Sequence, residues 1–253
     1  MKLSPMLLRT EGIVIRAIDY GESNKIVSLF TRTSGKISLM VRGAKKVRSR
    51  HSAIVQLFTH GDFVIYKGAG MGNLNHAEII HSYREIREDL HKAAYAAYLM
   101  ELIERLSTEG EANVTLFEQL LAALDAIKEG KDAAIVTHIM ELKLLALAGY
   151  YPQLRACVQC SRESSLQAFS AGQGGVLCSS CQSSDPYAQP LSGSLLNILQ
   201  LLQGTDLRRL GNTSVKPQTK HQLKTVLRAF LDTHLDARWK SRNFLDQLDK
   251  YEI

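Results

Sequence analysis

The sequence predicts a multidomain α+β protein, in which an N-terminal five-stranded β-barrel is followed by an α-helical domain with an inserted four-cysteine zinc module. Three observations predict this arrangement. Short segments rich in β-branched and aromatic residues fill the first 80 residues, helical periodicity follows, and all four cysteines fall within a window of 25 residues. The predicted domains are a barrel over 1–82, a helical domain over 83–149 and 191–253, and the zinc module over 150–190.

The β-like segments are short and separated by turn residues such as glycine, asparagine and serine. They cover residues 12–18, 25–30, 36–41, 62–66 and 77–80. Five strands over so few residues are typical of a small closed barrel, either the oligonucleotide-binding (OB) fold or an SH3-like barrel. The strand count does not distinguish the two folds.

Helical periodicity begins after Ser82. The expected helices cover 84–106, 113–127, 133–148, 195–202 and 218–235, and the second begins with a capping asparagine. Four cations lie at four-residue steps along the last helix: Lys216, Lys220, Lys224 and Arg228. Such a stripe is either an ordinary solvated helix face or a surface for phosphates or an acidic peptide.

Charge is unevenly distributed along the chain. Residues 1–80 carry a net +7, residues 81–207 a net −6 and residues 208–253 a net +5, within an overall charge of +6. The densest cationic segment runs from Arg42 to Arg50, and no acidic residue occurs between Lys36 and Gly61. This pattern is typical of a surface that contacts a phosphate backbone, although a solvated basic loop has the same composition.

The cysteines form two Cys-x2-Cys pairs, Cys157 with Cys160 and Cys178 with Cys181, separated by seventeen residues. This spacing is typical of a zinc ion bound by four thiolates, with no coordination position left for water or substrate. We therefore expect one structural zinc ion per chain. A redox-active pair, an iron–sulfur cluster and a chance arrangement are the alternatives.

Other classes of protein are disfavoured by what the sequence lacks. It contains no phosphate-binding Gly-Lys-Ser/Thr loop, no Gly-x-Ser-x-Gly motif and no His-Glu-x-x-His motif, which favours a binding protein over an enzyme. Four cysteines are too few for a disulfide scaffold, and no apolar run approaches the roughly 18 residues of a membrane span. These features predict a cytoplasmic protein.

Several short motifs together resemble the RecO family of bacterial recombination mediators over essentially the whole chain. They lie at residues 12–15, 20–25, 30–31, 35–36, 42–46, 141–145, 149–150 and 240–245, with the cysteine pairs between the last two. The resemblance implies an OB-fold barrel, a helical domain, a zinc module and no catalytic turnover. It also implies binding of single- and double-stranded DNA, annealing of complementary strands and a place at the nucleoid.

The partners implied by the resemblance are RecR, RecF, the RecA recombinase and the acidic C-terminal tail of single-stranded-DNA-binding protein (SSB). No membrane and no small-molecule substrate are expected. The predicted DNA-contact residues are cations in and beside the basic segment: Lys25, Lys36, Arg42, Lys45, Lys46, Arg48 and Arg50. The barrel aromatics Phe30, Phe58, Phe63 and Tyr66 are expected to be mostly core.

Two rival functions remain open from the sequence. One is a zinc-stabilised adaptor or transcription factor whose basic ends contact duplex DNA. The other is a thiol–disulfide enzyme that uses Cys157 and Cys160.

Overall fold

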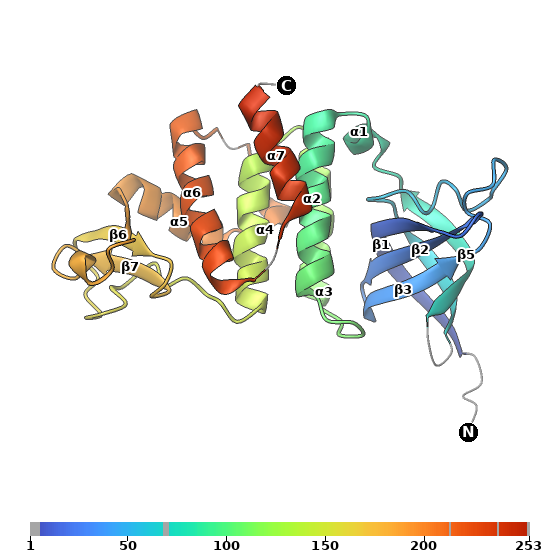
Figure 1. Ribbon diagram of the computed structural model, residues 1–253, viewed down its shortest axis with the longest axis horizontal. Coiled ribbons are helices and arrows are strands. Elements are labelled where there is room, and N and C mark those ends of the chain that lie inside the picture. Colours follow the sequence, from blue (N-terminus) through green and yellow to red (C-terminus); the bar gives the residue numbers. More distant parts are fainter. Residues whose placement is uncertain (1–5, 68–70, 213, 237, 252–253) are drawn as a thin grey trace. The chain divides into compact units, whose positions relative to one another are not determined.

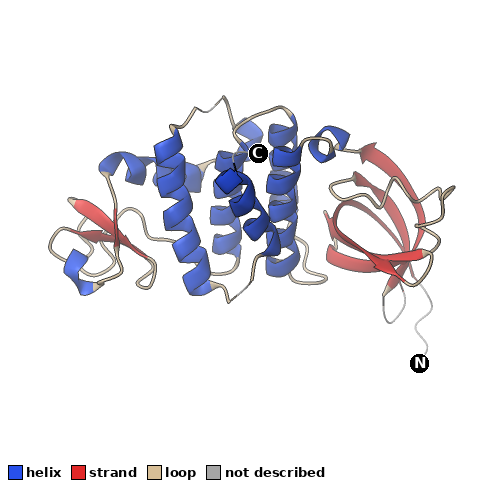
Figure 2. Ribbon diagram, turned by 45° about the horizontal axis from the view of Figure 1, so that its top comes forward, coloured by secondary structure: helices blue, strands red, loops and turns tan. Residues whose placement is uncertain are grey.

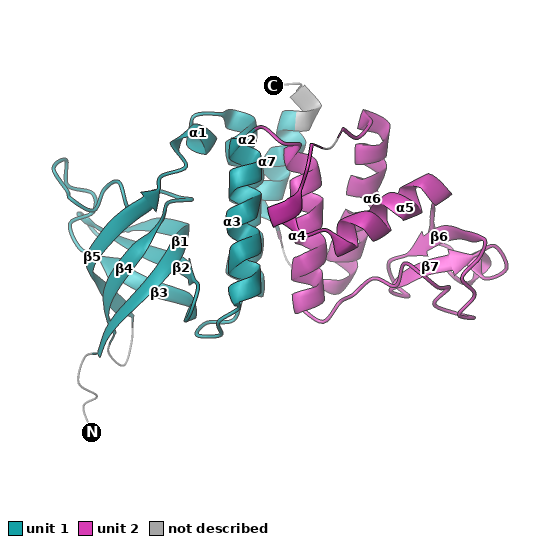
Figure 3. Ribbon diagram, turned by 180° about the vertical axis from the view of Figure 1, so that it is seen from behind, with its two compact units in different colours: residues 1–129, 239–253 teal, residues 130–238 magenta. Residues whose placement is uncertain are grey.

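The computed structural model describes residues 6–67, 71–212, 214–236 and 238–251. The chain divides into two compact units, one of residues Met1–Glu129 and Trp239–Ile253 and the other of residues Gly130–Arg238 (Figure 3). The boundaries between the units fall inside the predicted helical domain, and the three-part division made from the sequence stays a prediction. None of the described helices is long and apolar enough to cross a membrane.

The first unit begins with a closed β-barrel (Figures 1 and 2). Its strands are β1 (Met6–Tyr20), β2 (Asn24–Thr31), β3 (Gly35–Val41), β4 (His60–Lys67) and β5 (Gly72–His81). Around the barrel they follow the order β1-β2-β3-β5-β4, and only β3 and β5 pair in parallel among these neighbours. This topology is the OB fold, so the predicted five-stranded OB barrel is confirmed.

The barrel is filled by inward-facing side chains and is closed at one end by the β3–β4 connection. Strand β3 alternates strictly between buried and half-buried residues, as expected for a strand with one face on the core. Ile54 and Val55 from the connection belong to the same core cluster. Phe30, Phe58 and Phe63 are at most 2% exposed, which confirms them as core, whereas Tyr66 is 46% exposed.

Within the described residues, four helices complete the first unit. They are α1 (Arg84–Arg87), α2 (Leu90–Leu106), α3 (Val114–Lys128) and α7 (Lys240–Tyr251). The prediction of a single helix over 84–106 was wrong, because the helix is interrupted at Asp89. This residue has extended backbone angles, and its carboxylate accepts a hydrogen bond from the backbone N–H of Lys92, as an N-cap does. Helix α3 begins at the predicted cap, Asn113.

Helix α7 was not expected from periodicity, and it packs against α2. The preceding Trp239 is 2% exposed and meets the ring of Tyr98 edge-on at 6.4 Å between centroids. The carboxylate of Glu101 on α2 accepts hydrogen bonds from the backbone N–H groups of Lys240 and Ser241. A side chain of α2 therefore supplies the cap at the start of α7.

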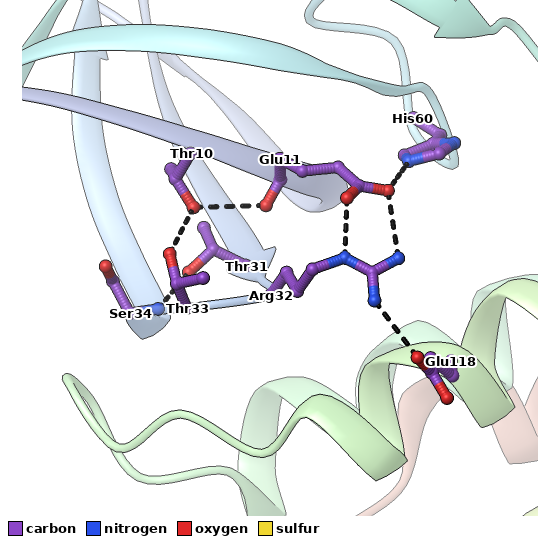
Figure 4. A network of polar contacts seen from close by, with 8 residues as sticks. All are labelled: Thr10, Glu11, Thr31, Arg32, Thr33, Ser34, His60 and Glu118. Carbon is purple, nitrogen blue, oxygen red and sulfur yellow. Dashed lines mark hydrogen bonds and ion pairs between the residues drawn. The ribbon is translucent and has the colours of Figure 1, made fainter.

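An ion-pair network joins the barrel to helix α3 of the same unit (Figure 4). Arg32 donates to both carboxylate oxygens of Glu11 at 2.6 and 3.3 Å and to Glu118 on α3 at 3.2 Å. His60 approaches Glu11 to 2.8 Å. The hydrogen bond from Arg32, despite partial burial, holds the pKa of Glu11 below its usual value of 4.5. The network joins β1, the residue after β2, β4 and α3.

The second unit contains helices α4 (Ala133–Leu147), α5 (Gly193–Gly204) and α6 (Pro217–His234) and a small sheet of order β7-β6-β8. The strands are β6 (Leu166–Ser170), β7 (Gly175–Cys178) and β8 (Gln189–Pro190), and single 3-10 turns lie at Gln182–Ser184 and Leu207–Arg209. Phe169 of β6 meets Phe230 of α6 edge-on at 5.6 Å between centroids. Phe169, which lies between the two cysteine pairs in the sequence, therefore packs on α6.

Candidate metal centre and nucleic-acid interface

The four cysteines converge on one point of the second unit. Cys157 and Cys160 lie in a turn after α4, Cys178 ends β7, and Cys181 precedes the 3-10 turn at Gln182. All four Sγ atoms lie within 4.8 Å of one another, and those of Cys160 and Cys178 are 3.7 Å apart. Four thiolates at about 2.3 Å from a tetrahedral zinc ion would be about 3.8 Å apart, which matches this distance.

Hydrogen bonds from the backbone favour the thiolate form of Cys157. Burial raises the pKa of Cys157, but hydrogen bonds from the backbone at Cys178 and Cys160 outweigh it and lower the pKa to about 6. Hydrogen bonds with neighbouring sulfurs raise the pKa of Cys181 to about 12. Sulfurs this close cannot all ionise unless a cation lies between them. The donor set therefore fits a thiophilic metal ion such as zinc.

The predicted DNA-contact cations lie in and beside the basic loop, which we define as residues 42–50. The exposed members are Arg42, Lys45, Lys46, Arg48 and Arg50. Within the described part of the chain, no carboxylate forms an ion pair with Arg42, Lys46, Arg48 or Arg50. These four charges are therefore available to an external anion.

Three other predicted cations have partners within the first unit. Lys25 and Lys45 both bind the carboxylate of Asp19, at 2.7 and 3.0 Å. The Nζ atom of Lys36 donates to the backbone carbonyl of Glu104 at 2.5 Å. The structure thus brings Lys25 and Lys45 together and directs Lys36 toward α2.

Asp19 was not identified from the sequence as the partner of Lys25 and Lys45. This residue pairs with Lys25 across the β1–β2 hairpin, and the hydrogen bonds from Lys25 and Lys45 lower the pKa of its carboxyl. The signal was present in the sequence, because a hairpin closed at residues 20–24 places Asp19 and Lys25 opposite each other.

The β1–β2 turn holds the start of the basic loop. The backbone N–H of Gly43 donates to the Asn24 side chain at 3.0 Å, and that of Lys45 donates to the Ser23 carbonyl at 3.0 Å. Gly43 has a φ of 67°, a left-handed conformation that glycine adopts without strain. Two of the recognised motifs, at 20–25 and 42–46, are therefore joined by hydrogen bonds.

The basic stripe of α6 is less exposed than the basic loop. Lys216 is exposed at the helix start, whereas Lys220, Lys224 and Arg228 are half-buried. The Nζ atom of Lys220 binds Asp132 at 3.0 Å. At least one of the four charges is thus used within the second unit.

Two family models match consecutive parts of the chain. The model described as "Recombination protein O N terminal" matches residues 6–83, and "Recombination protein O C terminal" matches residues 87–243. The chain belongs to the RecO family. The predicted resemblance is therefore confirmed over both units.

Curated members of the RecO family align with nearly the whole chain. A protein from Bacillus pumilus is 46% identical over 96% of this chain and 95% of its own length. Proteins from Halalkalibacterium halodurans and Bacillus cytotoxicus are each 44% identical, over 96% and 98% of this chain and 96% and 100% of their own lengths. Each is named DNA repair protein RecO. The chain is a member of this family of DNA repair and recombination proteins.

Proposed function

We propose that this protein is a recombination mediator that binds single- and double-stranded DNA and anneals complementary strands. With RecR and RecF it would help to load RecA onto DNA coated with SSB, whose acidic tail would be a further partner. The observation that carries the proposal is the basic loop, which presents four exposed cations without carboxylate partners among the described residues of an OB barrel.

DNA binding by this loop would be electrostatic. Cations that neutralise phosphates release condensed counterions, so affinity falls steeply with salt and depends little on base sequence. Arg42, Lys46, Arg48 and Arg50 would supply most of the binding, because Lys25 and Lys45 share Asp19 and Lys36 is held by a carbonyl. The annealing would need no nucleotide hydrolysis, since it requires only that two strands be brought together.

The four cysteines would hold one zinc ion with a structural role. Cys157, Cys160, Cys178 and Cys181 supply all four ligands of a tetrahedral site, so no position remains for a substrate. Metal analysis of protein purified without added metal should give about one zinc ion per chain. Four freely titratable thiols would instead favour a thiol–disulfide enzyme.

The function is tested by annealing two complementary strands that have been coated with SSB, with and without the protein. We expect faster annealing in the absence of any nucleotide. Absence of acceleration would contradict the mediator function. Strong preference for one duplex sequence in the same preparation would identify a zinc-stabilised adaptor or transcription factor.

A further inference from the structure

A groove on the outside of the barrel lies next to the basic loop. It has a volume of about 430 Å³, within the range of small-ligand sites. Its polar lining comes from the basic loop, from the adjacent His51, and from strands β4 and β5: Arg42, Arg50, His51, Tyr66, Asn73 and Asn75. Among the described residues, no carboxylate lines it.

Tyr66 is the aromatic residue of this groove, and unlike the barrel residues Phe30, Phe58 and Phe63 it is exposed. Along β4, Phe63 and Ile65 are buried in the barrel core, and Tyr66 follows on the opposite face. Its side chain is 46% exposed, whereas that of Phe63 is 1% exposed. An aromatic ring open to solvent beside cations has the composition of a base-stacking site on single-stranded DNA.

Arg50, one of the two arginines of the groove, is held by its neighbour His51. Arg50 donates from Nε to Nε2 of His51 at 3.2 Å, so this imidazole nitrogen acts as an acceptor. Burial, followed by the charge of Arg50, lowers the pKa of His51 below its usual value of 6.5. A neutral imidazole therefore orients Arg50 and leaves its positive charge for a phosphate.

We propose that this groove binds one unstacked nucleobase of single-stranded DNA on the ring of Tyr66. The neighbouring phosphates would bind Arg42 and Arg50, and the amides of Asn73 and Asn75 would meet the polar edge of the base. A base that is stacked within a duplex cannot also stack on Tyr66, so the groove adds a contact specific to single strands. This inference rests on the proposed DNA binding and deepens it.

The test compares Tyr66→Ala with two matched variants. Tyr66→Phe keeps the ring, and Tyr20→Ala removes another exposed tyrosine, 52% exposed, from the end of β1. Affinities are measured for a single-stranded oligonucleotide and for the duplex of the same length, over a series of salt concentrations. Equal thermal unfolding midpoints of the variants ensure that only folded proteins are compared.

We expect Tyr66→Ala to weaken single-strand binding about 5- to 150-fold, the effect of losing one stacked base, and duplex binding by less than about twofold. The salt dependence should not change, because no phosphate contact is lost. Tyr66→Phe and Tyr20→Ala should bind as the wild type does. Photocrosslinking of an oligonucleotide that carries 5-iodouracil should label the peptide that contains Tyr66.

Two results would overturn the inference. One is single-strand affinity of Tyr66→Ala equal to that of the wild type, and the other is an equal loss for single strands and duplex. Failure of the wild-type protein to bind any DNA would instead overturn the proposed function as a whole, so the two failures are distinguished by the wild-type measurement alone.

Discussion

The cysteine cluster and the basic loop place their functional side chains in opposite ways. The cysteines come from two turns of the second unit and bring four sulfurs within 4.8 Å of one another. The cations of the loop at residues 42, 46, 48 and 50 are exposed, and among them only Arg42 and Arg50 line the same groove. A metal site needs all its ligands at once, whereas phosphate contacts add up one by one. Loss of one residue should therefore be severe in the cluster and graded in the loop.

The largest effect is expected from Cys178→Ser. Structural zinc contributes about 10–16 kcal/mol to small zinc-binding peptides, and the loss of one thiolate removes much of it. We expect the metal content to fall far below one ion per chain and residues 150–190 to become sensitive to limited proteolysis. DNA affinity should change by less than about twofold, because the basic loop belongs to the other unit.

The control for this variant is Ser179→Ala, which changes an exposed neighbour of Cys178. The fluorescence of Trp239, the only tryptophan and a member of the first unit, should be the same in both variants. Wild-type metal content and protease resistance in Cys178→Ser would contradict the metal site. A large loss of DNA affinity would show that the module contacts DNA.

The second effect in size is expected from the double variant Arg42→Ala/Arg50→Ala. Each lost phosphate contact reduces the slope of log affinity against log salt by about 0.9 on duplex and about 0.7 on single strands. The variant should therefore lose about 1.8 and about 1.4 from the two slopes. Slopes equal to those of the wild type would show that the DNA lies elsewhere.

The third effect in size is expected from the ion-pair network of Glu11, Arg32 and Glu118, which joins the barrel to α3. The pKa of Glu11 is lowered by the hydrogen bond from Arg32, so the ionised network stabilises the folded first unit above pH 4.5. This stabilisation is lost as the pH falls below 4.5 through the lowered pKa of the folded state. Glu11→Gln should reduce the free energy of unfolding by about 1 kcal/mol at pH 7.

The measurement is urea unfolding followed by Trp239 fluorescence at pH 7, 5, 4 and 3. The difference between wild type and Glu11→Gln should shrink as the pH falls through this window. Since Trp239 lies in the first unit, protonation of the cysteine cluster should not dominate the signal. A difference that stays constant from pH 7 to pH 3 would contradict the role of the ionised carboxylate.

The smallest effect is expected from Lys25→Ala. Its ammonium group is already bound to Asp19, and removal leaves that carboxylate to Lys45. We expect DNA affinity within about twofold of the wild type. A loss as large as that of Arg42→Ala would show that Lys25 leaves Asp19 when DNA binds.

The sequence predicted the convergence of the four cysteines more completely than the contacts of the basic residues, and the reason is physical. Cys-x2-Cys spacing encodes a local turn, so two such turns were enough to predict one site from Cys157 to Cys181. Partners of a cation depend on strand register and on helices distant in the sequence. Asp19 was detectable from the hairpin, but the contact of Lys36 with the Glu104 carbonyl was not.

In the fold, too, elements that depend on neighbouring residues were predicted, and elements that depend on residues far apart in the chain were not. The five strands and the cap at Asn113 followed from alternation and capping residues near in sequence. Neither the interruption at Asp89 nor helix α7 was predicted from nearby residues. Helix α7 depends on the buried Trp239 and on a cap from Glu101, far away in the chain.

One comparison tests most directly whether the basic loop makes this chain a mediator. Annealing of SSB-coated complementary strands is measured with the wild type, Arg42→Ala/Arg50→Ala and Lys25→Ala. We expect clear acceleration by the wild type and by Lys25→Ala, with most of it lost in the double variant. Equal acceleration by all three proteins would show that the basic loop is not responsible for annealing.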